Sequence, residues 1–508
     1  MTELNKLPRN PEPYWRDSVT FSDFPQLKED LKVEVLVVGG GITGITTAYF
    51  LAKEGVKTAI IDAGKILHAT TGHTTAKITA QHDVIYDEYI QHFGEENARL
   101  YYEANMEALT WIHNTVSTKQ IECDFSFQDA YLYSTSEVDI QKLEKEVQAY
   151  KQLGIKGDLV TKPNLPFEVK AALVMEKQAQ FHPLQYLKYL VDEFIRHGGV
   201  IFENTTALKV EEADHPIVTT NQGFHITCDH LVIASHFPFY DGMGFYFTRL
   251  YAERSYALAV KTKKPFIGGM YLSIDKPTRS LRSVKVHGEN YLLVGGESHK
   301  TGQGIPTIQH YEALVAFTEE HYGIEKIAYR WSTQDLITLD KMPYIGPITS
   351  KKQKIYVATG FRKWGMTTGT AAGMILRDTI LQRENPYIDL FHPARFKSDP
   401  SIKHLITQNV DVAKHLVKGK VEMVLRRADE LQNDEGSVVA FQGRRAGAYR
   451  DESGTLHIVD TTCTHLGCEV EWNEGERTWD CPCHASRFSI DGDVIEGPAE
   501  QPLKKLNE

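Results

Sequence analysis

Residues 33–63 read VEVLVVGGGITGITTAYFLAKEGVKTAIIDA, and this stretch decides the fold of the first part of the chain. The apolar run VEVLVV predicts a β-strand, the glycines after it predict a turn, and ITTAYFLAKEG predicts a helix. KTAIIDA predicts a second strand. Strand, turn, helix and strand form one βαβ unit, so an α/β domain with a parallel sheet begins here.

The turn carries the pattern G-x-G-x-x-G at Gly39, Gly41 and Gly44. Between a strand and a helix, the first glycine allows a tight turn, the second admits a pyrophosphate and the third lets the helix pack closely. Asp62 ends the next strand, where a carboxylate can accept hydrogen bonds from ribose hydroxyls. The alternative, a glycine-rich turn without a ligand, leaves Asp62 unexplained. We therefore predict one bound dinucleotide, because no second stretch repeats this spacing.

Further along the chain, residues 86–165 show helical spacing, whereas 255–274 and 290–295 alternate as in an antiparallel sheet. Five stretches, in this order, resemble landmarks of the D-amino acid oxidase and glycine/sarcosine oxidase superfamily over about residues 30–395. They are residues 31–64, FHPLQYLKYLV, DHLVIAS, DKMPYIGPI and KIYVATGFRKWGMTTGTAAG.

This resemblance implies FAD in an extended pose in a Rossmann-like, glutathione-reductase-type α/β domain. An α+β substrate domain is interleaved with it, and its mixed sheet covers the isoalloxazine. The expected FAD-binding segments are 30–85, 166–240 and 330–395, those of the substrate domain are 86–165 and 241–329, a linker follows at 396–424, and an all-β domain occupies 425–508.

By position, the resemblance gives several residues a role at FAD. Gly39, Gly41, Gly44 and Asp62 would hold the ADP half, Val210 would lie near the adenine, and the turn with Gly360, Gly365 and Met366 would face the flavin pyrimidine ring. Asp62 departs from the glutamate that most members use. In HATTGHTTAK (68–77), Thr71, Thr74 and Lys77 are expected to donate to the pyrophosphate; the alternative for this stretch is a covalent flavin link through His73.

A second stretch, CTHLGCEVEWNEGERTWDCPCH (463–484), contains four of the six cysteines. Zinc sites normally pair C-x2-4-C knuckles, and four-cysteine iron–sulfur sites use other spacings than these cysteines show. Cys463 with His465 and Cys481 with His484 instead form two loops, each with one thiolate and one imidazole. That ligand set is typical of a Rieske [2Fe–2S] cluster.

CTHLGC and CPCH resemble the Rieske proteins of cytochrome bc1 and b6f complexes over about residues 425–508. The resemblance implies a disulfide between Cys468 and Cys483 that clamps the two loops. Ala485 replaces the usual glycine, and Phe488 replaces a tyrosine whose hydroxyl would donate to a cluster sulfur, whereas Ser486 keeps its hydroxyl. We therefore expect a lower reduction potential than in respiratory Rieske centres.

The net charge of −11, with no dense Lys/Arg block, argues against nucleic acid as a partner. No export signal or long apolar run is visible, so we expect a cytoplasmic protein without an integral membrane segment. Residues 425–508 hold 17 acidic against 9 basic residues. This excess serves either solubility or the docking of a basic redox partner.

A Rieske cluster also occurs in aromatic-ring oxygenases, and Asn221, His225 and His230 have the spacing of their mononuclear iron motif. That motif lies on a helix, whereas this segment runs into a predicted strand, so we favour histidines without a metal. Substrate orientation is assigned to Arg254, Tyr256 and Arg330, with Lys363 near the flavin; surface ion pairs are the alternative.

Together these features predict an FAD- and [2Fe–2S]-dependent oxidoreductase that exchanges electrons with an external partner. The resemblance to the D-amino acid oxidase superfamily implies that it acts on a C–N bond of an amine, N-methyl amine or amino acid. Two alternatives remain: an electron donor reduces the flavin through the cluster for a reductive or O2-dependent reaction, or the chain is a non-catalytic redox carrier or sensor.

Overall fold

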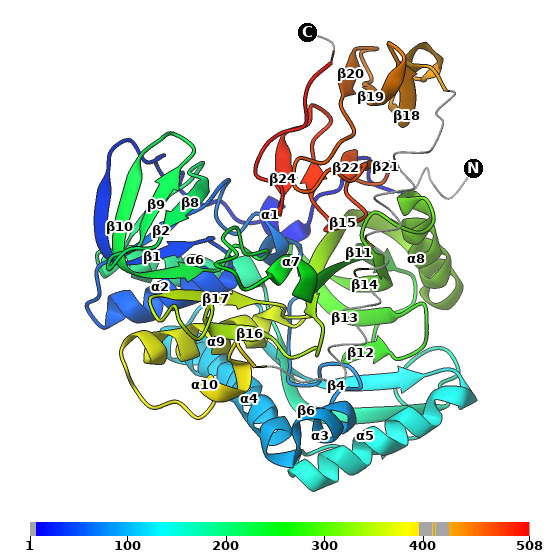
Figure 1. Ribbon diagram of the computed structural model, residues 1–508. Helices are drawn as coiled ribbons and strands as arrows, with labels where there is room; N and C mark the ends of the chain where they lie inside the picture. Colours follow the sequence, from blue (N-terminus) through cyan, green and yellow to red (C-terminus); the bar gives the residue numbers. More distant parts are fainter. Residues whose placement is uncertain (1–6, 396–408, 410–411, 413–425, 507–508) are drawn as a thin grey trace.

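The computed structural model describes residues 7–395, 409, 412 and 426–506. Two large sheets with their helices form the body of the molecule, and a small β domain lies against one side of it (Figure 1). Except for Asn409 and Val412, the expected linker 396–424 lies outside the described residues.

Five parallel strands form the centre of the first sheet. In spatial order they are β17 (Ile355–Thr359), β10 (His225–Ile233), β1 (Leu31–Val38), β2 (Thr58–Ile61) and β7 (Val200–Phe202). An antiparallel strand, β16 (Tyr344–Pro347), flanks β17, and the hairpin of β8 (Ala207–Glu211) and β9 (Ile217–Thr220) extends β10. This sheet confirms the α/β fold expected from residues 33–63.

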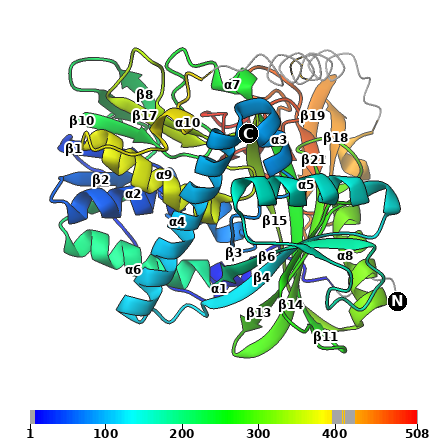
Figure 2. The same ribbon diagram turned by 90° about the horizontal axis from the view of Figure 1, so that it is seen from below.

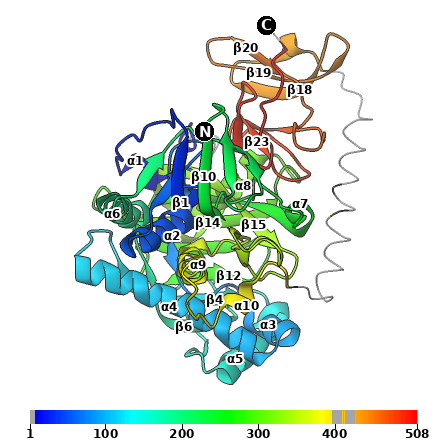
Figure 3. The same cartoon turned by 60° about the vertical axis from the view of Figure 1, so that its left-hand side comes forward.

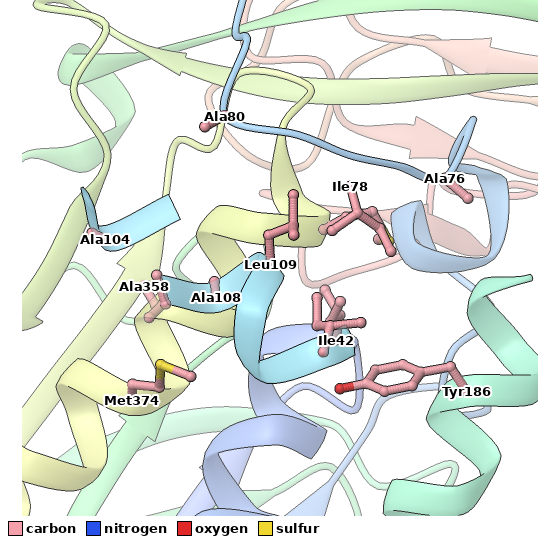
Figure 4. Packing of buried hydrophobic residues seen from close by; sticks show 14 of the residues in the cluster. Ile42, Ala76, Ile78, Ala80, Ala104, Ala108, Leu109, Tyr186, Ala358 and Met374 are labelled. Atoms are coloured by element: carbon pink, nitrogen blue, oxygen red, sulfur yellow. The ribbon is translucent and has the colours of Figure 1, made fainter. Parts of the chain in front are cut away.

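Helices packed on one another cover this sheet (Figure 2). They are α2 (Ile42–Lys53), α4 (Glu95–Lys119), α6 (Pro183–Arg196) and α9 (Gly365–Ile380). Small residues bring α9 close to α2: a Cβ on Gly369 would lie 2.8 Å from Thr43 Oγ1, and one on Gly373 2.9 Å from Thr46 Cγ2. Side chains of α2, α4 and α9 meet in one apolar core, as Ile42, Leu109 and Met374 show in Figure 4.

The second sheet is mixed, with nine strands. In spatial order these are β15 (Ile324–Thr338), β11 (Leu250–Thr262), β14 (Glu289–Lys300), β13 (Arg279–Val286), β12 (Met270–Ser273), β4 (Ser126–Ser134), β6 (Ala171–Gln180) and β3 (Lys77–Ile78), with β5 (Leu159–Val160) beside β6. Helices α5 (Ile140–Leu153) and α8 (Thr307–Tyr322) pack against this sheet, and α3 (Tyr86–Phe93) packs on α4 and α5. Among the described residues, α1 (Tyr14–Asp17), α7 (Tyr246–Arg249) and α10 (Ile388–Phe391) are short α-helices.

The sheets divide the chain differently from the expected domain boundaries in several places. β3 lies within 30–85, which was expected to bind FAD, but it pairs with β6 in the second sheet. β6 lies within 166–240, which was expected to bind FAD, but it pairs with β4 in the second sheet. β15 crosses the expected boundary at residue 330 because its whole length pairs with β11. β4 itself lies inside the segment read as helical. Each of these strands finds its partner far away in the sequence, so local spacing does not reveal the pairing.

The C-terminal domain consists of two small antiparallel sheets. One contains β18 (Glu435–Phe441), β19 (Arg444–Arg450) and β20 (Leu456–Val459); the other contains β21 (Glu471–Asn473), β22 (Thr478–Asp480), β23 (Arg487–Phe488) and β24 (Val494–Glu496). This confirms the expected all-β fold. The second sheet of this domain lies next to β15 and α8 of the body (Figures 1 and 3). Within the described part of the chain, no helix combines the length and apolarity needed to cross a membrane.

Candidate active site and iron–sulfur centre

A cavity of about 940 Å³ runs from the glycine turn after β1 to the second sheet and on to the C-terminal domain. This volume is at the upper end of ligand pockets, which suits a long ligand. Residues of all three parts line it, including Gly41 at the turn, Ser255 on β11 and Glu496 on β24.

The glycine turn has the backbone that close contact with a phosphate requires. Gly39 has φ +108°, and a Cβ there would lie 2.5 Å from the Ala234 carbonyl oxygen. A Cβ on Gly44 would lie 1.9 Å from the Gly39 oxygen, so only glycine fits at either position. Helix α2 begins at Ile42, and its amide donates to Thr71 Oγ1 at 3.0 Å. The turn and the first residues of this helix, Gly39, Gly41, Ile42 and Thr43, line the cavity, and a helix N-terminus in that place forms a cradle that fits a pyrophosphate.

The Asp62 carboxylate lies beside this cradle. It accepts hydrogen bonds from the amides of Gly40 at 2.8 Å and Gly64 at 2.9 Å. Burial raises the pKa of Asp62, and the two amides oppose that shift. The carboxylate lines the cavity, where ribose hydroxyls would add further donors.

Most residues predicted to hold FAD line this cavity. They are Gly39, Gly41, Asp62, Thr71, Thr74, Lys77, Gly365 and Met366. Gly44 packs behind the turn, and Gly360, with φ +77°, opens the loop that leads to α9. Val210 is buried in β8, while its neighbours Thr206 and Ala207 reach the cavity. The predicted roles of these residues at FAD stay predictions.

Lys77 and His73 occupy the side of the cavity next to the second sheet. Lys77 lies on β3 and donates to the Tyr271 carbonyl oxygen at 2.8 Å, and burial lowers its pKa to about 7. It therefore lies with the second sheet rather than at the glycine turn. His73 Nδ1 lies 2.9 Å from the Ala69 carbonyl oxygen, and burial lowers its pKa to about 4.

Alternate residues of β11 and β15 form one wall of the cavity. They are Tyr251, Glu253, Ser255 and Ala257 on β11 and Trp331, Thr333, Asp335 and Ile337 on β15. Glu253 is directly opposite Asp335 in the strand register. The sequence reading overlooked this pair of carboxyl groups, although the period-two pattern of the two strands contains it.

Lys363 reaches this wall from the loop before α9. Its Nζ lies 3.0 Å from Glu253 Oε2 and 2.6 Å from Ser298 Oγ. Burial opposes ionisation of Glu253, but the charge and hydrogen bond of Lys363 leave the pKa of Glu253 below its usual value. Burial raises the pKa of Asp335, against the effect of His236 and Lys363. Carboxyl groups held in this way can bind the cationic nitrogen of an amine.

The four residues assigned to substrate orientation separate into two pairs. Tyr256 and Lys363 line the cavity, and the Tyr256 hydroxyl lies 2.9 Å from His299 Nε2. Arg254 and Arg330 are not among the lining residues; instead they contact the C-terminal domain, and Arg330 Nη1 donates to the Gly475 carbonyl oxygen at 2.7 Å. By strand alternation Glu253 and Ser255 face the cavity, whereas Arg254 and Tyr256 share the other face of β11. On that face the Tyr256 ring stacks on His310, and Tyr256 still borders the cavity.

The predicted cluster ligands converge at one end of the C-terminal domain. The rings of His465 and His484 lie 4.9 Å apart between centroids, and both Nδ1 atoms are buried without a hydrogen-bond partner. The thiols of Cys463 and Cys481 form a hydrogen bond, which is the largest influence lowering the pKa of Cys463 to about 7. The two thiol sulfurs, together with two imidazole nitrogens that have no hydrogen-bond partner, fit the ligand set of a [2Fe–2S] cluster.

A disulfide joins Cys468 to Cys483 and confirms the expected pairing. The sulfurs of Cys468, Cys483 and Cys481 lie within 4.8 Å of one another, but the disulfide leaves only Cys481 able to bind metal. Ala485 has φ +63°, a conformation that explains why glycine is usual at that position. Phe488 is fully buried.

The histidine pair faces the body of the molecule. Phe247 lies 6.5 Å from the His465 ring and 6.3 Å from the His484 ring, between centroids. Phe237 lies 6.5 Å from His465 and also lines the large cavity. Phe237 therefore lies between the cluster site and the cavity.

The oxygenase-like residues have no comparable arrangement. His225 and His230 lie on strand β10 rather than on a helix, and Asn221 lies in the turn before it. His230 Nδ1 lies 3.3 Å from the Tyr356 hydroxyl. The mononuclear iron alternative is therefore not supported.

A dinucleotide cradle under a mixed sheet, joined to a two-cysteine, two-histidine centre, defines a flavoprotein oxidoreductase with an iron–sulfur domain. The chain belongs to the family of FAD dependent oxidoreductases (DAO), whose model matches residues 34–379, and its residues 421–507 match the Rieske [2Fe-2S] domain. Its cofactors are therefore FAD and one Rieske [2Fe–2S] cluster.

Two known proteins and one solved structure illustrate the similarity. "Putative Rieske 2Fe-2S iron-sulfur protein YhfW" of Bacillus subtilis (strain 168) is 52% identical over 497 residues, 98% of both chains. The gamma-glutamylputrescine oxidoreductase of Escherichia coli (strain K12) is 22% identical over 378 residues, 71% of this chain and 86% of its own. The crystal structure of glycine oxidase from Geobacillus kaustophilus has a TM-score of 0.62 at 16% identity and covers 72% of this chain and 99% of its own.

Proposed function

We propose that this protein is a dehydrogenase that oxidises the C–N bond of a small amine, N-methyl amine or amino acid. The substrate loses two electrons and two protons, and water hydrolyses the resulting imine. Two equivalents of an external one-electron acceptor take up the electrons. When bound, FAD can accept electrons in pairs and the [2Fe–2S] cluster can pass them on singly.

The observation that carries this proposal is the position of Phe237 between the two sites. Phe237 lines the large cavity and lies beside His465, so the cavity that fits FAD ends next to the imidazole side of the cluster site. A flavin oxidase that gives its electrons to O2 has no need of such a neighbour. This arrangement supports the transfer of electrons between flavin and cluster.

The substrate class is supported by the paired carboxyl groups Glu253 and Asp335 over the cavity, which suit a cationic nitrogen. The names of the Escherichia coli relative and of the solved glycine oxidase also point to amine and amino-acid substrates. The external partner and a cytoplasmic location stay predictions.

Anaerobic stopped-flow spectroscopy with a panel of amines, N-methyl amines and amino acids tests the proposal. We expect at least one compound to bleach the flavin first and the cluster afterwards. Bleaching by reduced ferredoxin alone would instead support the reverse flow of electrons. No turnover with any donor would leave a redox carrier or sensor as the better interpretation.

A further inference from the structure

Four side chains of alternating charge form a closed ring between the C-terminal domain and the second sheet. Arg254 comes from β11, and Asp480, Arg487 and Glu496 come from β22, β23 and β24. Arg254 Nε lies 3.9 Å from Asp480 Oδ2, and its Nη2 lies 3.6 Å from Glu496 Oε2. Arg487 Nε lies 3.3 Å from Asp480 Oδ1, and its Nη1 lies 3.4 Å from Glu496 Oε1. We call these four residues the charge ring.

The charge ring is largely closed to water. The exposed fractions are 1% for the Arg254 side chain, 4% for Asp480, 9% for Arg487 and 20% for Glu496. Its two positive and two negative charges balance, as burial requires. Without the C-terminal domain, Arg254 would keep only the neutral acceptors Ser332 Oγ at 2.7 Å and Gln334 Oε1 at 3.2 Å. Arg254 therefore needs the docked domain in order to be buried with its charge matched.

The ring adjoins the loop that presents Cys481 and His484. Asp480 directly precedes Cys481 in the sequence. On the other side of the loop, Gln334 Nε2 donates to the Ala485 carbonyl oxygen at 3.0 Å, and Gln303 Nε2 donates to that of Pro482 at 3.2 Å. The body of the molecule thus holds this ligand loop at both ends.

Backbone contacts show how closely the two surfaces fit. A Cβ on Gly302 would lie 2.7 Å from Pro482 Cα, so a side chain there would separate the domains. The Gly475 amide donates to Thr307 Oγ1 at 3.0 Å, and the Gly475 carbonyl oxygen accepts from Arg330. In Figure 1, β22 and β24 lie beside β15. Such close backbone contacts favour a single docked arrangement.

We propose that the charge ring locks the C-terminal domain in one position on the flavin-binding body, with Arg254 as the positioning residue, so that electrons pass between the two cofactors without domain movement. The inference rests on the proposed function for the path of the electrons. Each passage moves one electron and makes or breaks no bond in the protein. Arg254 acts by holding the cluster loop. It does not line the large cavity itself, although its ring partners Arg487 and Glu496 do.

The test compares four holoproteins: wild type, Arg254→Met, the double variant Arg254→Met with Glu496→Gln, and Arg99→Met. The single variant leaves one excess negative charge in the ring, whereas the double variant restores balance through the pair of Asp480 and Arg487. Arg99 pairs with Glu95 on the exposed face of α4 and serves as the control. Hydrogen–deuterium exchange is followed for the peptide that contains Gly475, and cluster reduction is followed by electron paramagnetic resonance after photoreduction of the flavin.

We expect Arg254→Met to accelerate exchange at Gly475 and to slow reduction of the cluster, each by about tenfold, because an unbalanced buried charge opens the interface. In the double variant, the exchange rate at Gly475 and the rate of cluster reduction should both lie within roughly threefold of the wild-type values. Arg99→Met should match wild type in both. If Arg254→Met shows the same exchange at Gly475 and the same rate of cluster reduction as wild type, the charge ring does not lock the domain.

If Arg254→Met does not fold, the single variant Glu496→Gln decides, because it unbalances the ring from the more exposed side. Faster exchange at Gly475 supports the inference, and unchanged exchange overturns it. The two proposals can fail separately. Failure of every amine to bleach the wild-type flavin contradicts the proposed function, while the exchange measurement still tests the lock.

Discussion

Cys463 and Cys481 are free cysteines in a domain whose other two cysteines form a disulfide. Cys463→Ser removes one of the two thiolates that would hold iron, so we expect loss of the [2Fe–2S] signal in electron paramagnetic resonance with the flavin spectrum unchanged. Cys228→Ser is the matched control, since Cys228 is also a buried free cysteine but lies on β10. Retention of the cluster in Cys463→Ser, or its loss in Cys228→Ser, would contradict this ligand assignment.

Phe488 lies where a hydroxyl would be expected to reach a cluster sulfur. Phe488→Tyr should raise the midpoint potential by roughly 40 mV, the equivalent of one hydrogen bond of about 1 kcal/mol in a one-electron couple. Redox titration followed by electron paramagnetic resonance measures it. Phe488→Leu, which adds no hydroxyl, should give no rise. Equal potentials for Phe488→Tyr and wild type would remove the missing hydroxyl as the cause of a low potential.

Asp335 and Glu253 are expected to bind the substrate nitrogen. For an amine that bleaches the flavin, Asp335→Asn should raise KM about tenfold or more and change kcat less, because a hydrogen bond to a charged group contributes about 1.5–3 kcal/mol. Steady-state kinetics with an artificial acceptor measures both constants. Ser255→Ala, on the same face of β11, is the uncharged control. An unchanged KM in Asp335→Asn would place the amine elsewhere.

At the residue scale, the sequence predicts those functional residues that belong to a motif of fixed spacing. The glycines of the turn, the four cluster ligands and the disulfide pair are close in sequence to the residues with which they act. Asp335 and Glu253 could be found only as a cross-strand pair. For Arg254 and Arg330, the position of a domain that begins at about residue 425, far along the chain from both, was needed. Their charges indicated importance but not which surface they contact.

At the scale of single elements, helix α3 depends on a distant side chain. Its first amides have no local capping residue; instead Glu146 of α5 accepts hydrogen bonds from Ile85 and Tyr86 through Oε1, at 3.0 and 2.9 Å, and from Asp87 through Oε2 at 3.0 Å. Burial raises the pKa of Glu146 to about 7 despite these three amides. Neither the cap nor the pKa shift could be predicted from the sequence around α3.

This shift predicts a pH dependence of stability. A carboxyl whose folded pKa lies above its usual value contributes stability that is fully present below about pH 4.5 and is lost as the pH rises through about 7. Glu146→Gln does not titrate at this position. The difference in free energy of unfolding, wild type minus Glu146→Gln, should therefore decrease as the pH rises from about 4.5 to 7.

Urea unfolding of both proteins at several pH values measures this difference. Glu144→Gln, on the exposed face of the same helix, is the control and should show no such trend. A difference that stays constant or increases with pH would contradict the shift.

At the scale of the molecule, the order of motifs along the chain predicts two joined redox domains, because each motif contains its own local signal. The strand order of the second sheet was harder to predict from the sequence, since β3, β4, β6 and β15 pair with strands that lie far away along the chain. The sequence did not indicate at all against which side of the body the C-terminal domain packs. Contacts such as that of Gly302 with Pro482 have no signature in either segment.

The charge of the C-terminal domain bears on its external partner. Residues 425–508 carry 17 acidic and 9 basic residues, and several of the arginines already pair within the domain, as Arg445 does with Glu471 and Arg477 with Asp434. A basic one-electron acceptor should therefore be steered to this domain by long-range attraction. Reduction of a small basic cytochrome c by the substrate-reduced protein should slow about tenfold between roughly 0.05 and 0.5 M salt, because salt screens that attraction. An uncharged dye acceptor, measured by the same stopped-flow method, should show little change, and equal salt dependence for both acceptors would assign the acidic excess to solubility alone.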